Sequence, residues 1–341
     1  MASLKDIAKE CGVSVATVSK ALNDQADISS QTKEKVRAAA ERLGYSPNAA
    51  AISLKTDRTE NIGVLFVDEA RSGLTHEFFA RILDSFKRTA EAHGYDITFI
   101  NSSSANGSRL ARMSYLEHAR YRRFDGVVIA CVDFTDPEVI ELIGGEIPVV
   151  TIDHIFNNRT AILSDNIGGV KDLTTYCYNK GHRKIAFIHG SKSTVAQNRL
   201  SSFYRTAEQL GLEVPDAYVI PSDYRNLEAA CRATEQLLDL PDPPTCILYP
   251  DDYSAFGGIK AIRRRGLRIP EDISIAGFDG TPIAEQIDPR LTTVAQNTEE
   301  MGRLAAMHLI EEIRHPKTSL VEVITVGTEV SPGESVGTCR K

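Results

Sequence analysis

Apolar positions in the first 45 residues repeat with the spacing of short amphipathic helices. Residues 4–11 follow the i, i+3, i+4 pattern of one buried helical face. Gly12 interrupts this pattern, and Ser14 is a suitable N-cap for a second helix over residues 14–22. Two short helices joined by a tight turn that contains glycine are typical of a helix-turn-helix unit.

Two more helices are expected before residue 60. The third runs from about residue 32 to 43 and ends before Gly44. The fourth covers residues 46–54, with Ser46 as its cap and Pro47 in its first position. At about eight residues it is too short to be stable alone in water. We therefore expect it to form only when a second copy and a duplex hold it.

The pattern alone is compatible with an ordinary three-helix bundle. The outward face of the second helix instead favours DNA binding, because its side chains are short, polar or methyl-bearing, with one long cation. A face of this kind lets a helix approach base edges in the major groove. Its residues are Ser14, Val15, Ala16, Thr17, Ser19, Lys20 and Asn23.

From residue 61 the pattern changes to alternating strands and helices, which is typical of parallel α/β domains. Strands are expected at 62–67, 95–101, 126–132 and 147–152, with a helix at 78–93. The same order then returns, with strands at 184–189, 219–220, 246–249 and 273–277 and a helix at 199–210. Because two sequence fragments also recur in the same order, we expect two similar lobes that face each other across a cleft.

Acidic residues follow several predicted strands, at the ends where parallel sheets bind ligands. They are Asp153, Asp279 and the pair Asp251-Asp252. An aspartate in this position can also be the cap of the next helix, and for Asp252 the two roles are equally plausible. Arg199 is expected to open a helix, which the helix dipole disfavours, so it is a candidate for reaching into the cleft.

Three aromatic residues are expected near the same strand ends. They are Tyr224, Phe78 and Phe79. Each alone is readily explained as a core residue. Together with the acids and Arg199, they suit a polyhydroxylated or ring-shaped small molecule.

Two segments identify a family resemblance. Residues 13–23, VSVATVSKALN, resemble the signature of LacI/GalR-type repressors, and residues 45–55 resemble the hinge helix of that family. The resemblance extends over nearly the whole chain. It implies an N-terminal all-α helix-turn-helix headpiece (1–45), a hinge helix and linker (46–60), and an α/β core like periplasmic binding proteins (61–341). In that core we expect two doubly wound parallel-sheet lobes, one of about 61–160 and 292–325 and the other of about 161–291 and 326–341.

The resemblance also implies roles in binding operator DNA. We expect Val15, Ala16 and Lys20 to read base edges. The candidate phosphate contacts are Ser14, Thr17, Asn23, Tyr45 and Asn48. Ala51, Leu54 and Lys55 are expected in the minor groove, with Leu54 as an apolar wedge. Residues 327–341 contain no leucine heptad, so a homodimer on a roughly palindromic operator is expected.

A further implication of the resemblance is an effector site. Arg199, Asp279 and Tyr224 look like the effector-binding arginine, aspartate and stacking aromatic of the family. The remaining expected contacts are Phe78, Phe79, Asp153 and Asp251. Where many members have Asn-Asp, this chain has Asp251-Asp252, and its segment 68–76 also departs from the family pattern. The effector therefore need not be the usual pyranose.

Composition and charge say less than the motifs about the class of protein. The 341 residues are 42% apolar and 25% charged, as in globular proteins, with a formal net charge of −7. Residues 1–60 carry a net charge of +1 and the rest −8, a contrast that favours a nucleic-acid partner only weakly. The longest apolar run is about seven residues, against roughly 18 for a membrane span. With no signal-peptide pattern and six scattered cysteines, a soluble cytoplasmic protein is expected.

Enzyme motifs point away from catalysis. We find no phosphate-binding loop, no dinucleotide fingerprint and no clustered histidines, so neither a cofactor nor a metal is expected. Residues 333–337 match Gly-x-Ser-x-Gly, but a nucleophile elbow needs a following helix and histidine, so we expect a flexible tail. The sequence thus predicts a ligand-responsive repressor. The alternative is a cytosolic small-molecule-binding protein or hydrolase that uses the two-lobed cleft without binding DNA.

Overall fold

The computed structural model describes residues 2–46, 58–67, 73–100, 113–190 and 193–339. The chain divides into two compact units, Met1–Thr59 and Glu60–Lys341, and each is described by itself. Apart from Ser46, the predicted hinge helix at 46–54 lies outside the described residues.

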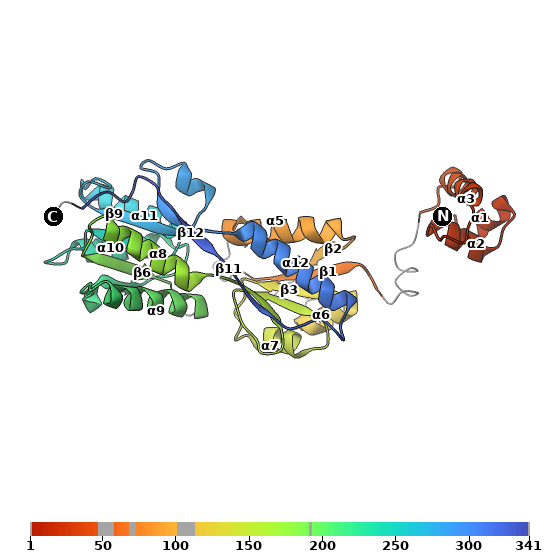
Figure 1. Cartoon of the computed structure of the whole chain (residues 1–341), viewed down its shortest axis with the longest axis horizontal. Coiled ribbons are helices and arrows are strands. Elements are labelled where there is room, and N and C mark those ends of the chain that lie inside the picture. The colour runs from red at the N-terminus through yellow and green to blue at the C-terminus, as the bar shows by residue number, and fades with distance from the viewer. Residues whose placement is uncertain (1, 47–57, 68–72, 101–112, 191–192, 340–341) are drawn as a thin grey trace. The chain divides into compact units, whose positions relative to one another are not determined.

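The first unit is a small helical domain (Figure 1). It contains α1 (Leu4–Cys11), α2 (Val15–Leu22) and α3 (Ser30–Arg42). Gly12 ends α1 with a φ of +66°, a left-handed conformation that glycine adopts without strain. The Ser14 side chain caps α2 by accepting a hydrogen bond from the backbone N–H of Thr17. Apolar residues of all three helices form the core: Ile7, Ala8, Cys11, Val18, Ala21, Val36, Ala39 and Ala40.

The first lobe of the second unit is built on a six-stranded parallel sheet (Figure 1). Its strands, in spatial order, are β11 (Val323–Val326), β5 (Thr160–Ser164), β4 (Val149–Ile152), β3 (Gly126–Ala130), β1 (Asn61–Phe66) and β2 (Asp96–Phe99). Helices α5 (Glu77–Ala92) and α12 (Thr298–Arg314) share one core with the sheet. A second core holds α6 (Tyr115–Arg122) and α7 (Pro137–Gly144) against the sheet. A short 3-10 helix, η1 (Gly73–Thr75), precedes α5.

The second lobe repeats this architecture. Its strand order is β12 (Thr328–Ser331), β10 (Thr292–Gln296), β9 (Ser274–Asp279), β8 (Cys246–Leu248), β6 (Ile185–His189) and β7 (Val219–Pro221). The edge strand β12 pairs antiparallel with β10, so this sheet is not wholly parallel as expected. Helices α10 (Leu227–Leu238) and α11 (Asp252–Arg264) share one core, and α8 (Asn166–Asn179) and α9 (Thr194–Gln209) share another. Two 3-10 helices, η3 (Asp216–Tyr218) and η4 (Pro282–Glu285), lie in its loops.

The borders of the lobes differ from the expected ones. Strand β5 continues to Ser164 within the first sheet, beyond the expected border at 160. Strand β10, expected in the first lobe, belongs to the second, because its residues 292–295 pair with β9. The chain therefore crosses between the sheets after β5, after β10 and between β11 and β12.

The segment at 333–337, expected to be a flexible tail, is docked on the second lobe. Ser335 is fully buried, and its hydroxyl donates to the carbonyl of Ile275 at 2.7 Å and accepts from the N–H of Thr292 at 2.8 Å. The expectation was wrong because this serine satisfies backbone groups of β9 and β10. The serine of the Gly-x-Ser-x-Gly match therefore has a structural role in hydrogen bonding and is not placed as a nucleophile.

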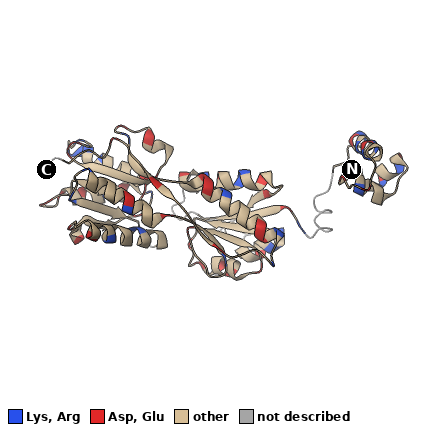
Figure 2. Ribbon diagram, in the orientation of Figure 1, with Lys and Arg blue, Asp and Glu red and all other residues tan. Residues whose placement is uncertain are grey.

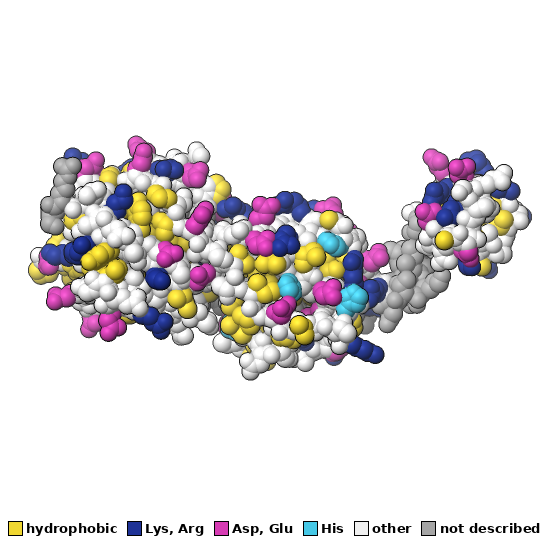
Figure 3. Space-filling view, in the orientation of Figure 1, with side chains coloured by type: hydrophobic (Ala, Val, Ile, Leu, Met, Phe, Trp, Pro, Cys, Tyr) yellow, Lys and Arg dark blue, Asp and Glu magenta, His cyan; other side chains and the backbone are white. Residues whose placement is uncertain are grey.

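Charged and apolar side chains are interspersed on the face of the second unit that Figure 3 shows. Among the described residues, no helix is long and apolar enough to cross a membrane.

Candidate functional site

The outward face of α2 is exposed as the sequence predicts. Val15 is 40% exposed, and Ala16 and Lys20 are also exposed. Behind them, Val18 and Ala21 are fully buried against α1 and α3. The helix therefore presents two short apolar side chains and one ammonium group to solvent, a surface that can approach base edges closely.

Several of the expected phosphate contacts have local partners. The Ser14 and Thr17 hydroxyls lie 2.9 Å apart at the N-terminus of α2, and the Asn23 amide donates to the carbonyl of Ser19 at 2.8 Å. Tyr45 packs against the helical core and is partly buried. The remaining predicted DNA contacts, Asn48, Ala51, Leu54 and Lys55, lie outside the described residues.

Acids lie among the basic residues of this unit, as Figure 2 shows. Lys20 pairs with Asp27, Lys33 and Arg37 pair with Asp24, and Arg42 pairs with Glu10. The acids in these pairs keep the net charge of the headpiece low. Sequence reasoning missed Asp27, because no local pattern links it to a side chain seven residues earlier.

Arg199 is the fixed centre of a polar cluster in the second unit. Its Nε donates to Asn166 Oδ1 at 2.7 Å, and its Nη1 donates to the Pro250 carbonyl at 2.8 Å. Its guanidinium carbon lies 3.6 Å from the centre of the Phe278 ring, and the side chain is buried. The sequence predicted that Arg199 opens a helix. Helix α9 instead begins at Thr194, so Arg199 lies in its second turn. The helix-dipole argument for Arg199 was therefore wrong, although the residue does lie among acids.

Asp153 and Asp279 bring carboxyl groups to this cluster from the two lobes. Asp153 directly follows β4, and Asp279 is the last residue of β9. Both side chains are partly exposed, and both residues have a positive φ, +56° for Asp153 and +113° for Asp279. Asp153 accepts from the N–H of Ser164 at 2.9 Å, and Asp279 accepts from the amide of Gln296 at 2.7 Å. Loss of solvation raises the pKa of Asp153 to about 6 and the pKa of Asp279 well above its usual value. The charge of Arg199 opposes both shifts, so one cation acts on carboxyls of both lobes.

Tyr224 adds an aromatic ring to the cluster. Its partial burial raises the pKa of the phenol, with smaller effects from Arg199 and the acids Asp251 and Asp279. The ring lies over Gly190, where a β-carbon would be 2.2 Å from the ring carbons. A side chain at position 190 would therefore displace the ring.

Two buried polar atoms in this region have no hydrogen-bond partner among the described residues. They are Ser164 Oγ and Gln296 Oε1. Ser164 and Gln296 are the residues that also bind Asp153 and Asp279. Because buried polar groups are normally paired, unpaired atoms beside these carboxyls indicate a site for a polar ligand.

The other expected effector residues have structural roles. Phe78 is only 6% exposed and lies in the core of the first lobe, so the structure does not support a ligand contact for it. Phe79 is partly buried and packs edge-on against Phe66 and His76.

The carboxylates of Asp251 and Asp252 both accept hydrogen bonds from other residues of the protein. Asp251 caps α11 and accepts from the Ser254 N–H and hydroxyl and from the Arg225 N–H, so a ligand role is not supported by its geometry. Asp252 is fully buried and accepts from the N–H and hydroxyl of Thr281 and from the hydroxyl of Thr293. Burial raises the pKa of Asp252 to about 7.

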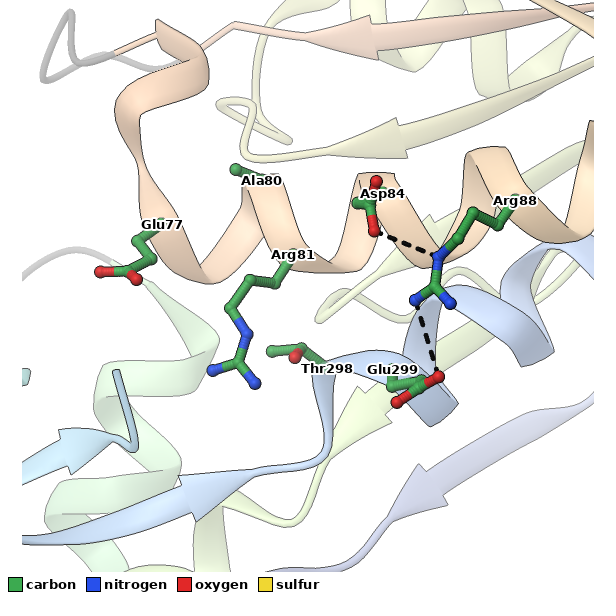
Figure 4. A pocket seen from close by; sticks show the side chains of 7 residues that line it. All are labelled: Glu77, Ala80, Arg81, Asp84, Arg88, Thr298 and Glu299. Atoms are coloured by element: carbon green, nitrogen blue, oxygen red, sulfur yellow. Dashed lines mark hydrogen bonds and ion pairs between the residues drawn. The ribbon is translucent and has the colours of Figure 1, made fainter. Parts of the chain in front are cut away.

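A surface hollow of about 320 Å³ is lined by residues of α5 and the start of α12 (Figure 4). Within it, Arg88 pairs with Asp84 on its own helix and with Glu299 at the start of α12. None of the predicted site residues lines it. Its lining residues are Glu77, Ala80, Arg81, Asp84, Arg88, Thr298 and Glu299.

Comparison with known proteins agrees with both parts of the fold. Residues 3–48 match the model for bacterial regulatory proteins of the lacI family, and residues 174–336 match the periplasmic binding protein-like domain. The chain is 33% identical to the probable HTH-type transcriptional repressor ExuR of Bacillus subtilis (strain 168), covering 98% of each protein. It is 32% identical to the ribose operon repressor of Escherichia coli (strain K12), covering 93% of this chain and 94% of that one.

A solved structure shares the same fold. The lac repressor dimer bound to operator and the anti-inducer ONPF superposes with a TM-score of 0.82 at 24% identity, over 98% of this chain and 99% of that chain. The protein is thus a helix-turn-helix regulator with a two-lobed core like periplasmic binding proteins. It belongs to the LacI family and is a ligand-responsive transcriptional repressor. The predicted family and fold class are confirmed, and the named relatives are repressors, not enzymes.

Proposed function

We propose that the protein binds a palindromic operator as a homodimer and reads base edges with Val15, Ala16 and Lys20. The observation that carries this proposal is the exposed face of α2, which presents two short apolar side chains and one ammonium group. Lysine suits the acceptors of guanine, and short apolar groups suit thymine methyls. Because the partner is bacterial DNA, we expect the repressor to act in the cytoplasm.

The backbone contacts follow from the same orientation of α2. The Ser14 and Thr17 hydroxyls and the N-terminus of α2 would face a phosphate, which helix N-termini favour. Asn23, Tyr45 and Asn48 complete the proposed phosphate contacts. The hinge residues Ala51, Leu54 and Lys55 would lie in the minor groove, with Leu54 opening a base step. Ala49, Ala50 and Ala51 are small enough for two hinge helices to pack closely.

The proposed effector is a polar metabolite such as a sugar or sugar derivative, held between the lobes. Arg199, Asp153 and Asp279 would bind its hydroxyl groups, and Tyr224 would stack on its ring. The unpaired Ser164 Oγ and Gln296 Oε1, beside Asp153 and Asp279, support this proposal. One relative is named for the ribose operon, which agrees with a sugar-like ligand.

Binding of the effector would change the angle between the lobes and so control the hinge. Two arginine side chains join the lobes: Arg81 donates to the carbonyl of Gly280 at 3.2 Å, and Arg225 to that of Thr75 at 3.3 Å. A ligand that prefers one lobe arrangement shifts the balance between arrangements by its difference in affinity. The distance between the first residues of the two hinge helices in the dimer would change with the lobe arrangement.

Binding to duplexes selected from a random-sequence library tests the DNA proposal. We expect a two-fold symmetric site, a steep fall in log K with log salt, and loss of the site in Lys20→Met. In a second assay, Leu54→Ala should reduce DNA bending and specific affinity. If the protein shows no salt-dependent DNA binding, the alternative of a binding protein or hydrolase without DNA is favoured.

A thermal-shift screen against sugars, sugar acids and nucleosides tests the effector proposal. A compound that binds the folded protein raises its melting temperature. We expect at least one compound to do so and to alter operator affinity. A compound that raises the melting temperature equally in Asp279→Asn binds elsewhere.

A further inference from the structure

Lys20, on the proposed base-reading face, is already paired within its own headpiece. Its Nζ lies 2.5 Å from Oδ2 of Asp27, in the turn that joins α2 to α3. The two side chains are 48% and 53% exposed, so the pair lies at the surface. The hydrogen bond from Lys20 lowers the pKa of Asp27 below its usual value.

We propose that Asp27 is a positioning residue that orients the Lys20 ammonium and thereby sets the base preference of the repressor. The inference rests on the proposed function, in which Lys20 reads a base edge. Asp27 itself need not contact DNA.

The chemistry of lysine explains why a partner matters. Its ammonium group has three N–H donors on a flexible chain of four carbons. One donor binds Asp27, and two remain, which is the number that the O6 and N7 acceptors of guanine need. Without the carboxylate, the ammonium samples many rotamers and reaches phosphates of any sequence. Holding the side chain in advance reduces the entropy lost when it binds a base.

The pair is poorly suited to a role in stability. Exposed ion pairs contribute little to folding, because water screens them and two side chains lose freedom. The carboxylate also adds a negative charge beside a surface that meets phosphates, which weakens binding to any duplex. An effect on sequence preference is therefore the feature that distinguishes Asp27 from an ordinary surface acid.

Asp24 provides an internal control in the same turn. Its Oδ1 lies 3.0 Å from both Lys33 Nζ and Arg37 Nη2, on α3, and it is not paired with Lys20. Its φ of +57° is one that asparagine tolerates well. Asp24→Asn and Asp27→Asn therefore remove the same charge from one turn, but only the second removes the charged partner of Lys20.

The test selects binding sites from a library of random-sequence duplexes with the full-length protein. The variants are Asp27→Asn, Asp24→Asn, Lys20→Met and the double variant Lys20→Met with Asp27→Asn, each checked for helical content by circular dichroism. We expect Asp27→Asn to lose about two- to five-fold discrimination at the half-site position that Lys20→Met also loses. Asp24→Asn should keep that discrimination, although both asparagine variants bind random duplexes more tightly. Asp27→Asn should add no further loss to Lys20→Met.

Three results would overturn the inference while the wild type still selects a symmetric site. They are unchanged discrimination in Asp27→Asn, an equal loss in Asp24→Asn, and an additive loss in the double variant. If the wild type selects no site at all, the proposed function fails and the inference fails with it, so the two failures are distinguishable.

Discussion

The guanidinium carbon of Arg199 lies 3.6 Å from the centre of the Phe278 ring, directly before Asp279 in the chain. Stacking on the ring and hydrogen bonds to Asn166 and Pro250 fix the plane of the guanidinium. One buried cation is thus held rigidly near the carboxyls of both lobes. In the proposed effector site, this arrangement would give a ligand a preformed donor and avoid the cost of ordering a free arginine.

Replacing Arg199 by methionine is expected to abolish the thermal shift caused by the effector. It should also lower the free energy of unfolding by about 1–3 kcal/mol, because the Asn166 side chain and the Pro250 carbonyl each lose a buried partner. Thermal shift with the compound found in the screen and urea unfolding measure the two effects. Arg205→Met, an exposed position on the same helix, is the control and should retain the response. A full response in Arg199→Met would remove this residue from the effector site.

Asp252 makes stability depend on pH. Folding raises the pKa of this carboxyl from 3.8 to about 7, so in this interval the folded state binds more protons than the unfolded state. Its contribution to stability is therefore greatest near pH 4 and declines as the pH rises to 7. Asp252→Asn should remove this decline, so that the difference in unfolding free energy between variant and wild type changes by up to about 1.4 kcal/mol per pH unit. Urea unfolding at several pH values measures it, and parallel curves for the two proteins would contradict the prediction.

The contact between α5 and α12 leaves no room for a side chain at Gly302. A β-carbon there would lie 2.2 Å from the Ile82 carbonyl oxygen and 2.8 Å from the Phe86 nitrogen, both of them backbone atoms that cannot easily move. Gly302→Ala should therefore destabilise the core unit by roughly 1–3 kcal/mol in urea unfolding. At Gly144 a β-carbon meets nothing within 4 Å, so Gly144→Ala is the matched control and should change stability by less than about 0.5 kcal/mol. Equal stability of the two variants would show that the helices separate without cost.

Local patterns were sufficient to predict the elements of the headpiece. The i, i+3, i+4 spacing, Gly12 and Ser14 act within a few residues, and the structure has α1 and α2 where these signals place them. Eight of the twelve strands in the described residues were found by their apolar runs, whereas β5, β10, β11 and β12 were not predicted as strands. Strand β10 was assigned to the wrong lobe, because its partner β9 is fixed by pairing between distant residues and not by its own sequence.

Individual side chains of the proposed effector site were harder to predict. Phe78 and Phe79 are neighbours in sequence, yet only Phe78 enters the core, because the rotation of α5 against the sheet decides which face is buried. Asp251 has the residue type of a ligand contact, but the backbone of α11 and Arg225 uses its oxygens. Asn166 and Phe278, which hold Arg199, were missed because they lie 33 and 79 positions from it in the chain.

The threading of the two sheets has a consequence for synthesis of the protein. Strands β11 and β12, at residues 323–331, are edge strands of the first and second sheets, so neither sheet is complete until nearly the whole chain has left the ribosome. The three helices of the headpiece come from the first 42 residues and have their own core. In each newly made molecule the part that recognises the gene is therefore able to mature first, well before the part that senses the metabolite.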